Sequence, residues 1–212
     1  AQGAFVLGGC LGYLPRGAIV VAVVDPGVGS DRKAIAVKTA NHVFVAPDNG
    51  LLTPILTGTR IEELIALNNV HYWLETQSTT FHGRDLFSPV GAHIAAGVAL
   101  RDLGESIGVA DCIVLPDPVL MEVSPGVEWR GEVIYTDGFG NLVTSFPNDL
   151  GSDRDAWSVV VDDHVIAGIK QTFSDVPPGA PVIYTGSAGR LEVGVCNGNA
   201  SARLGVAAGQ SL

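Results

Sequence analysis

The apolar positions in the first half of the chain gather in unbroken runs. Residues 17–24 (GAIVVAVV) are small or β-branched without a polar interruption, a pattern typical of a strand covered on both faces and too short to cross a bilayer. Helices are predicted after Asp48, over residues 50–56, and after an N-cap at Ser88, over residues 89–100. We therefore expect an α/β domain with a buried, mainly parallel sheet.

The pattern changes at the sequence LPDP, residues 115–118, after which short apolar runs alternate with turn residues. We place a domain boundary there, so that residues 1–117 form an α/β sandwich domain and residues 118–212 form a small β-barrel-like domain. A hairpin turn is predicted at residues 162–164. The strands expected in the second domain are 131–135, 142–146, 158–161, 165–169, 182–184 and 191–195.

Asp25 directly follows the first apolar run, at the carboxyl end of the predicted strand, where open α/β sheets bind their ligands. Pro26 and the glycines after it turn the chain sharply, and Arg32 comes seven positions after Asp25 across this loop. A guanidinium that keeps its charge can fold back onto the carboxylate or hold a polar ligand beside it. The alternatives are that Asp25 only caps its turn and that Arg32 pairs with Asp31 at the surface.

His82 is the second candidate for chemistry. It lies in the polar, glycine-containing stretch TTFHGRD, residues 79–85, just before the helix predicted to begin after Ser88. Loops held on rigid elements carry functional side chains more often than the elements themselves. The alternative is a structural histidine whose ring nitrogens are satisfied by its neighbours, which is the commoner role for a lone histidine.

Charge and cysteine content exclude several function classes. The formal net charge is −10 and no basic stripe occurs, which argues against a nucleic acid as the partner. The three cysteines have no metal-like spacing, and the five histidines form no two-histidine helix motif, so no metal is expected. The odd cysteine number and the lack of a membrane-spanning run lead us to expect a cytoplasmic protein in a reducing compartment, without a membrane partner.

Five phrases of the sequence occur in the order and spacing of a known family: VVDPGVGSDR, VFVAPDNGLL, FHGRDLFSPVGAHIAAG, YTDGFGNLVTS and GSAGRLEVGVCNGNAS. On these phrases the chain resembles the S-adenosyl-L-methionine (SAM) hydroxide adenosyltransferases, or SAM hydrolases, which are related to the fluorinating and chlorinating SAM enzymes. The resemblance implies that a water attacks C5′ of the SAM ribose and releases adenosine and methionine. It places Asp25, Arg32 and His82 around that water, and either Asp25 or His82 can then be the base.

The resemblance also assigns binding residues in the second domain. From the sequence alone, the loop TDGFGN offers a carboxylate, an aromatic face and an amide, and GSAG offers backbone N–H groups that suit an anion such as a carboxylate. The family uses the residues matching Asp137 and Asn141 to hold the methionine portion of SAM and the residue matching Phe139 to pack against the ligand. The alternative is a turn that Asp137 and Asn141 merely stabilise. The further implied contacts are Ser187, Ala188, Glu192, Val195, Asn199 and Ala200.

The resemblance further implies a homotrimer whose sites lie between the first domain of one subunit and the second domain of its neighbour. In the family, the segment matching residues 2–5 is preceded by more of the catalytic domain, whereas this chain opens on Ala1 and its only methionine is Met121. We therefore expect a sheet that lacks its first strands, unless a separate chain supplies that N-terminal segment.

The sequence leaves two other functions open. A SAM halogenase would place chloride or fluoride at the same carbon, although the Asp25 carboxylate would repel a halide ion. A SAM- or adenosine-binding module without turnover is the other. For the leading hypothesis SAM is the substrate and no cofactor is expected, because a sulfonium leaves without the help of a metal.

Overall fold

The protein is described here by a computed structural model, which covers residues 1–150 and 153–212. The chain divides into two compact units. The first comprises Ala1 and Gly3–Leu115, and the second comprises Gln2 and Pro116–Leu212. Each unit has its own buried apolar clusters, so each is described by itself.

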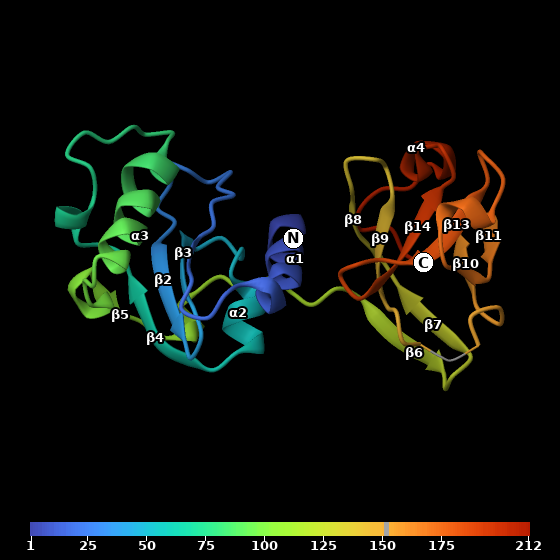
Figure 1. The fold of residues 1–212 in the computed structure, drawn as a ribbon, viewed down its shortest axis with the longest axis horizontal. Coiled ribbons are helices and arrows are strands. Elements are labelled where there is room, and N and C mark those ends of the chain that lie inside the picture. The colour runs from blue at the N-terminus through green and yellow to red at the C-terminus, as the bar shows by residue number, and fades with distance from the viewer. Residues whose placement is uncertain (151–152) are drawn as a thin grey trace. The chain divides into compact units, whose positions relative to one another are not determined.

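The first unit is built on a five-stranded sheet with the order β1-β3-β2-β4-β5 (Figure 1). Only β1 and β3 are parallel, with Val20 opposite Phe44, and the other three pairs are antiparallel. Two α-helices and a short π-helical turn accompany the central strands. The bounds are β1 Ile19–Val21, β2 Ala34–Thr39, β3 Val43–Pro47, α2 Thr53–Gly58, β4 Ile61–Ala66, η3 Gly83–Phe87, α3 Ser88–Ala95 and β5 Glu105–Ser106.

The α/β class is confirmed, but the sheet is not mainly parallel. Strands β2 and β3 are joined by a connection of three residues, and so short a connection can join only antiparallel neighbours. The strand expected over residues 17–24 is also shorter and less buried than its sequence indicates. β1 lies at the edge of the sheet, and Val21, Val23 and Val24 are 38%, 40% and 57% exposed. An apolar run predicts that a strand forms. How many neighbouring strands it pairs with depends on the rest of the sheet.

Strand β2 shows how the two faces of this sheet are covered. Ala34 and Ala36 point into a cluster with residues of η3 and α3, while Ile35 and Val37 point into a second cluster with residues of α2. This two-residue alternation is the ordinary geometry of a strand. The face of the sheet with Ala34 and Ala36 is therefore covered by α3 and by η3, and His82 directly precedes η3.

The predicted helices occur, with shifted ends. The helix expected from residue 50 begins at Thr53, because Gly50 adopts a positive φ of 88° in the turn before it. The helix expected from residue 89 is preceded by the π-helical turn η3, so Ser88 is not an N-cap and its hydroxyl donates instead to the carbonyl of Gly83 at 2.7 Å. This helix ends at Ala95, just before Gly97 with its positive φ of 95°.

The second unit contains a five-stranded sheet with the order β12-β13-β14-β9-β8 and two hairpins, β6-β7 and β10-β11. The turn at Asp162 and Asp163 is confirmed, since Val161 pairs with His164 across it. The strand expected over 165–169 is divided at Gly168, and the one expected over 131–135 is divided at Glu132. The strand bounds are β6 Leu120–Ser124, β7 Glu128–Gly131, β8 Val133–Thr136, β9 Leu142–Pro147, β10 Ser158–Val161, β11 His164–Ala167, β12 Ile169–Lys170, β13 Pro181–Thr185 and β14 Arg190–Val195.

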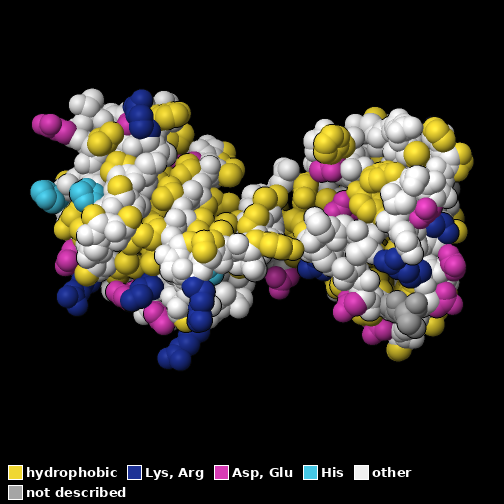
Figure 2. Space-filling view, in the orientation of Figure 1, with side chains coloured by type: hydrophobic (Ala, Val, Ile, Leu, Met, Phe, Trp, Pro, Cys, Tyr) yellow, Lys and Arg dark blue, Asp and Glu magenta, His cyan; other side chains and the backbone are white. Residues whose placement is uncertain are grey.

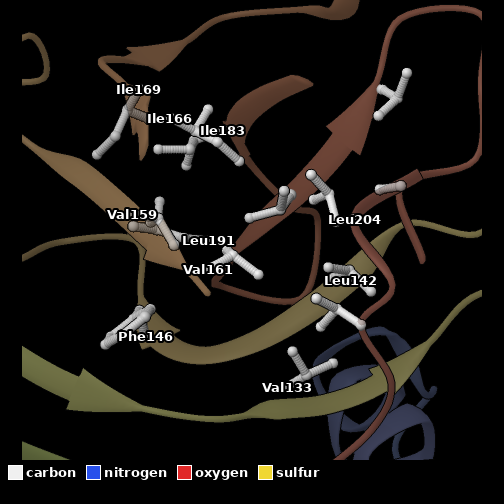
Figure 3. Packing of buried hydrophobic residues seen from close by; sticks show 14 residues of the cluster. Val133, Leu142, Phe146, Val159, Val161, Ile166, Ile169, Ile183, Leu191 and Leu204 are labelled. Carbon is white, nitrogen blue, oxygen red and sulfur yellow. The ribbon is translucent and has the colours of Figure 1, made fainter. Parts of the chain in front are cut away.

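The core of the second unit is one cluster that draws side chains from nearly all of these strands. Figure 3 shows Leu142 of β9, Ile183 of β13 and Leu191 of β14 within it, together with Leu204 of α4 (Ala200–Leu204). The remaining helices are short or terminal: α1 Gln2–Cys10, η1 Leu11–Tyr13, η2 Val70–Tyr72, η4 Leu100–Asp102, η5 Val109–Asp111 and η6 Phe173–Asp175.

The surface carries mixed charge. On the face drawn in Figure 2, Lys and Arg side chains are scattered among acidic and apolar ones. Within the part of the chain that the structure describes, no helix is long and apolar enough to cross a membrane. Within the same residues, no group of three or more His, Cys, Asp or Glu side chains is placed to hold a metal ion.

Gly50 offers a test of this packing. A Cβ on Gly50 would lie 2.6 Å from the Leu115 side chain, on a backbone with φ of 88°. We expect Gly50→Ala to lower the free energy of unfolding by about 1 to 3 kcal/mol, since strain and overlap add. Gly58→Ala, in helix α2 with nothing within 4 Å, is the control and should be neutral or stabilising in a thermal melt. Equal effects of the two substitutions would contradict this packing.

Candidate functional site

The segment after β1 is folded back by two successive turns. The backbone N–H of Val28 donates to the carbonyl of Asp25 at 3.2 Å, and the N–H of Ser30 donates to the carbonyl of Gly27 at 3.1 Å. Gly29 has a φ of 81°, and a Cβ there would lie 2.8 Å from the carbonyl oxygen of Thr79. Glycine is therefore needed where this loop touches the loop that leads to His82.

Arg32 returns onto Asp25, as the first of the two sequence-based interpretations proposed. Its Nε lies 3.1 Å from Oδ1 and 3.0 Å from Oδ2 of Asp25, and its Nη2 lies 2.5 Å from Oδ2. The two side chains are only 9% and 6% exposed. A nearly buried pair of this kind is screened little by solvent, so the guanidinium fixes the position of the carboxylate. Arg32 is not paired with Asp31.

His82 joins the same pair. The Nη2 of Arg32 lies 2.9 Å from Nδ1 of His82, fifty residues away in the chain. A guanidinium nitrogen only donates, so Nδ1 must be the acceptor in this hydrogen bond. The hydrogen bond thus assigns the neutral tautomer of His82, with its proton on Nε2. The structure therefore brings Asp25, Arg32 and His82 into one hydrogen-bonded cluster.

Asp25 and His82 line a pocket of about 570 Å³. Its wall combines residues of the segment after β1 with residues of the loop before α3, of η3 and of the start of α3. Arg32 does not belong to this wall, because it lies behind Asp25 and His82 and connects them. The lining residues are Val23, Asp25, Val28, Thr80, Phe81, His82, Gly83, Arg84 and Ser88.

A second ion pair, Arg84 with Asp85, braces the loop that carries His82. The Arg84 Nε donates to Asp85 Oδ1 at 2.6 Å, and the backbone N–H of Ser78 donates to Oδ2 at 2.7 Å. Asp85 is 1% exposed. The hydrogen bond from Arg84, followed by that from Ser78, lowers the pKa of Asp85 below its usual value, and burial opposes this shift. Sequence reasoning missed this pair, because adjacent Arg and Asp residues are ordinarily a solvated surface pair.

In the second unit, the Asp137 carboxylate is engaged by its own loop. Oδ1 accepts from the backbone N–H groups of Phe139 and Asn141, both at 2.8 Å, and Oδ2 accepts from the Asn141 side-chain amide at 2.9 Å. This is the turn-stabilising role that the sequence left open for Asp137 and Asn141. It also holds the ring of Phe139, which is 82% exposed, at the tip of the loop.

Glu192 is half-buried and is not an ordinary solvent-facing residue. The hydroxyl of Tyr184 donates to its Oε2 at 2.6 Å. Burial raises the pKa of Glu192, with the Tyr184 hydrogen bond acting in the opposite direction and the charge of Asp137 in the same one. Burial, and then the hydrogen bond to Glu192, raise the pKa of the Tyr184 phenol. Glu192 and Asp137 thus lie close enough for their charges to interact.

The remaining candidates of this unit are divided between exposed and buried positions. Ser187 and Ala188 are exposed in the turn between β13 and β14. The side-chain oxygen of Asn199 accepts from the N–H of Ala202 at 2.8 Å and so caps α4. A Cβ on Gly140 would lie 2.2 Å from the Asn199 side chain, so α4 packs on the Asp137 loop. Val195 and Ala200 are buried, 3% and 0% exposed, and can offer a ligand little beyond backbone atoms.

Family models match both units of the chain. Residues 1–104 match the SAM hydroxide adenosyltransferase N-terminal domain, and residues 131–212 match the C-terminal domain of the same family. The chain belongs to the SAM hydroxide adenosyltransferase family. Asp25, Arg32 and His82 fall within the matched N-terminal domain of this family, and all the binding candidates fall within the matched C-terminal domain.

Individual relatives agree with this assignment. The chain is 38% identical to the (R)-S-adenosyl-L-methionine hydrolase of Salinispora arenicola, over 100% of this chain and 79% of that protein. A fluorinase of Actinopolyspora mzabensis is 26% identical, over 85% of this chain and 71% of the fluorinase. The crystal structure of an uncharacterised conserved protein from Thermotoga maritima superposes with a TM-score of 0.85 at 34% identity, over 99% of this chain and 82% of that one. The hydrolase is thus more similar to this chain than the fluorinase is.

Asp85 should make the stability of the protein depend on pH in the acid range. Because its pKa is lowered on folding, its contribution is complete above the usual carboxyl value of 3.8 and is lost as the pH falls through the lower value of the folded state. We therefore expect Asp85→Asn to melt below the wild type at neutral pH, with a gap that closes below pH 3.8.

Thermal melts between neutral pH and pH 3 measure this gap. Asp31→Asn is the matched control, since Asp31 is exposed and makes no hydrogen bond or ion pair with the described residues. A constant gap for Asp85→Asn across the acid range would show that the charge of Asp85 has no part in bracing the loop.

Proposed function

We propose that this protein hydrolyses S-adenosyl-L-methionine to adenosine and L-methionine. The proposal rests on one observation: Asp25 and His82 line the same pocket, and Arg32 connects them by hydrogen bonds to both. Membership of the SAM hydroxide adenosyltransferase family and the name of the Salinispora relative support this substrate. By the same name, the (R) epimer of the sulfonium is the proposed stereoisomer.

The chemistry is a displacement at one carbon. The water oxygen forms a bond to C5′ of the ribose while the bond from C5′ to sulfur breaks. The electron pair of the broken C5′–S bond stays on sulfur, which leaves as the neutral thioether of methionine. The water loses one proton, so the products are adenosine, methionine and a proton. A sulfonium leaves without metal or acid, so we propose no cofactor, and the protein must aim, desolvate and deprotonate one water.

The hydrogen bonds divide these tasks between the two residues of the pocket wall. His82 accepts from Arg32 at Nδ1, so its remaining nitrogen carries a proton and can only donate to the water. Asp25 forms an ion pair with Arg32, and its carboxylate oxygens keep lone pairs that can accept the proton of the water. We therefore assign Asp25 as the proton acceptor and His82 as the donor that orients the water. Arg32 holds both and favours hydroxide character in the bound water through its charge.

We propose that the second unit holds the rest of the substrate. Asp137, Asn141 and Glu192 supply polar groups for the amino acid portion, and exposed Phe139 supplies an aromatic face. The turn with Ser187 and Ala188 offers backbone N–H groups for the carboxylate. Val195, Asn199 and Ala200 border the same loops and contribute backbone contacts.

We also propose that the complete site forms in a homotrimer, between the first unit of one subunit and the second unit of its neighbour. Residues of both units then serve one ligand. The open edge of β1, with its exposed valines, is suited to a further strand, which a separate N-terminal segment could supply. Sedimentation that detects only monomers at working concentration would contradict the shared site.

The halogenase remains the second candidate, because fluorinases are also relatives. A carboxylate on the pocket wall disfavours a halide nucleophile by charge repulsion and favours water. Chromatography with and without chloride or fluoride separates the two, since a halogenase forms 5′-halo-adenosine. Calorimetric binding of SAM without turnover would instead favour a binding module.

Incubation with SAM in oxygen-18 water tests the reaction directly. We expect adenosine labelled at its 5′-hydroxyl in mass spectrometry, because the attacking oxygen comes from solvent. Separated epimers of SAM should differ, with the (R) sulfonium consumed faster. Unlabelled adenosine would exclude attack of water at C5′.

Substitution of the pocket wall tests the assigned roles. We expect Asp25→Asn to lower kcat by about 100-fold or more, because the proton acceptor is lost, with a smaller change in KM. His82→Ala should also lower kcat more than it changes KM. His71→Ala, at an exposed histidine outside the pocket, is the control and should leave kcat unchanged. Retention of kcat in Asp25→Asn would refute the assignment of the base.

A further inference from the structure

The guanidinium of Arg32 rests on an aromatic ring that neither the sequence motifs nor the proposed reaction has assigned a role. Its Cζ lies 5.1 Å from the centre of the Phe87 ring, over the face of that ring. Phe87 is 0% exposed and belongs to the core between the sheet and α3. It does not line the pocket, so any effect on the reaction must pass through Arg32.

The π-helical turn η3 explains why Phe87 can reach Arg32 at all. His82 precedes the first residue of η3 and Phe87 is its last residue, so the two are five positions apart. In an α-helix with 3.6 residues per turn, a step of five overshoots one turn by about 140°, and the two side chains would point apart. The wider π-helical turn, with its hydrogen bonds from i to i+5, keeps them close to one face. His82 and Phe87 thus both contact the same guanidinium.

Three contacts fix the position and the plane of the Arg32 guanidinium. Asp25 and His82 hold its edge through hydrogen bonds, and Phe87 covers one of its two faces. Its side chain is 9% exposed, and attraction between a cation and a ring is stronger when both are desolvated. Rotation of the guanidinium out of this plane would break the hydrogen bonds to Asp25 and His82 together.

We propose that Phe87 is a positioning residue for the pocket. It sets the plane of Arg32, and through Arg32 it sets the distance and angle between the Asp25 carboxylate and the His82 ring. This inference rests on the proposed hydrolysis for its effect on rate, whereas the positioning itself does not depend on the substrate. A flat aromatic face is required for this role, and apolar volume alone does not provide it.

Phe87→Leu tests the proposal, because it keeps an apolar side chain in the core and removes the ring. We expect kcat for SAM hydrolysis to fall by about 10-fold, with KM within about 2-fold of the wild type. Phe44→Leu is the matched control. Phe44 is 1% exposed in β3 of the same unit and packs in the cluster on the opposite face of the sheet. It should lose similar thermal stability and keep kcat within about 2-fold.

A second measurement does not need activity. The Nε–H of Arg32 is donated to Asp25 beside the Phe87 ring, so its proton NMR resonance reports both the ring and the hydrogen bond. We expect Phe87→Leu to move this resonance and to speed its exchange with water, while Phe44→Leu leaves it in place.

The two measurements separate the two proposals. If the wild type does not hydrolyse SAM but the Arg32 resonance responds only to Phe87→Leu, the positioning role stands and the proposed function fails. If the wild type is active and Phe87→Leu keeps its kcat, or loses no more than Phe44→Leu, Phe87 is only a core residue. An unchanged Arg32 resonance in Phe87→Leu overturns the positioning role in the same way.

Discussion

The first unit's pocket depends on one nearly buried ion pair, between Arg32 and Asp25. The guanidinium has been withdrawn from water, so its charge must be matched by neighbours, and a lone buried cation would be strongly destabilising. Asp25 supplies the matching charge, and Nδ1 of His82 accepts from the remaining N–H of the same nitrogen. Arg32 therefore joins its own loop to the loop of His82, fifty residues away in the chain, and it orients the Asp25 and His82 side chains at the pocket.

The surrounding structure serves this pair at several levels. Gly29 lets the Asp25 loop approach the backbone at Thr79, and Asp85 anchors the loop through Ser78 and Arg84. The sheet and α3 hold the ends of both loops in place. Because these elements are fixed before any ligand arrives, the polar groups of the pocket are preorganised, which is how a protein can favour a transition state without reorganising around it.

The second unit follows a different principle. Its candidate groups sit on turns at the ends of β8, β13 and β14, and they are held by bonds within their own loops. Glu192 is the exception, because it is partly desolvated and accepts a hydrogen bond from the Tyr184 hydroxyl. Rigid loops that expose one aromatic ring and a few polar atoms are suited to recognition, while the first unit carries the groups suited to proton transfer.

The sequence by itself determined the change of pattern near residue 115, most strands of the second unit, the family, and the choice of Asp25, Arg32 and His82 as candidates. These features depend on local backbone preferences and on residue types at short separation, which a sequence displays directly. Only the tertiary structure decided that β1 lies at the edge of a mostly antiparallel sheet, that Arg32 stands behind the pocket wall, and that Asp85 and Phe87 support it. Such features depend on which distant segments meet, and no local pattern encodes the position of a side chain relative to a partner far along the chain.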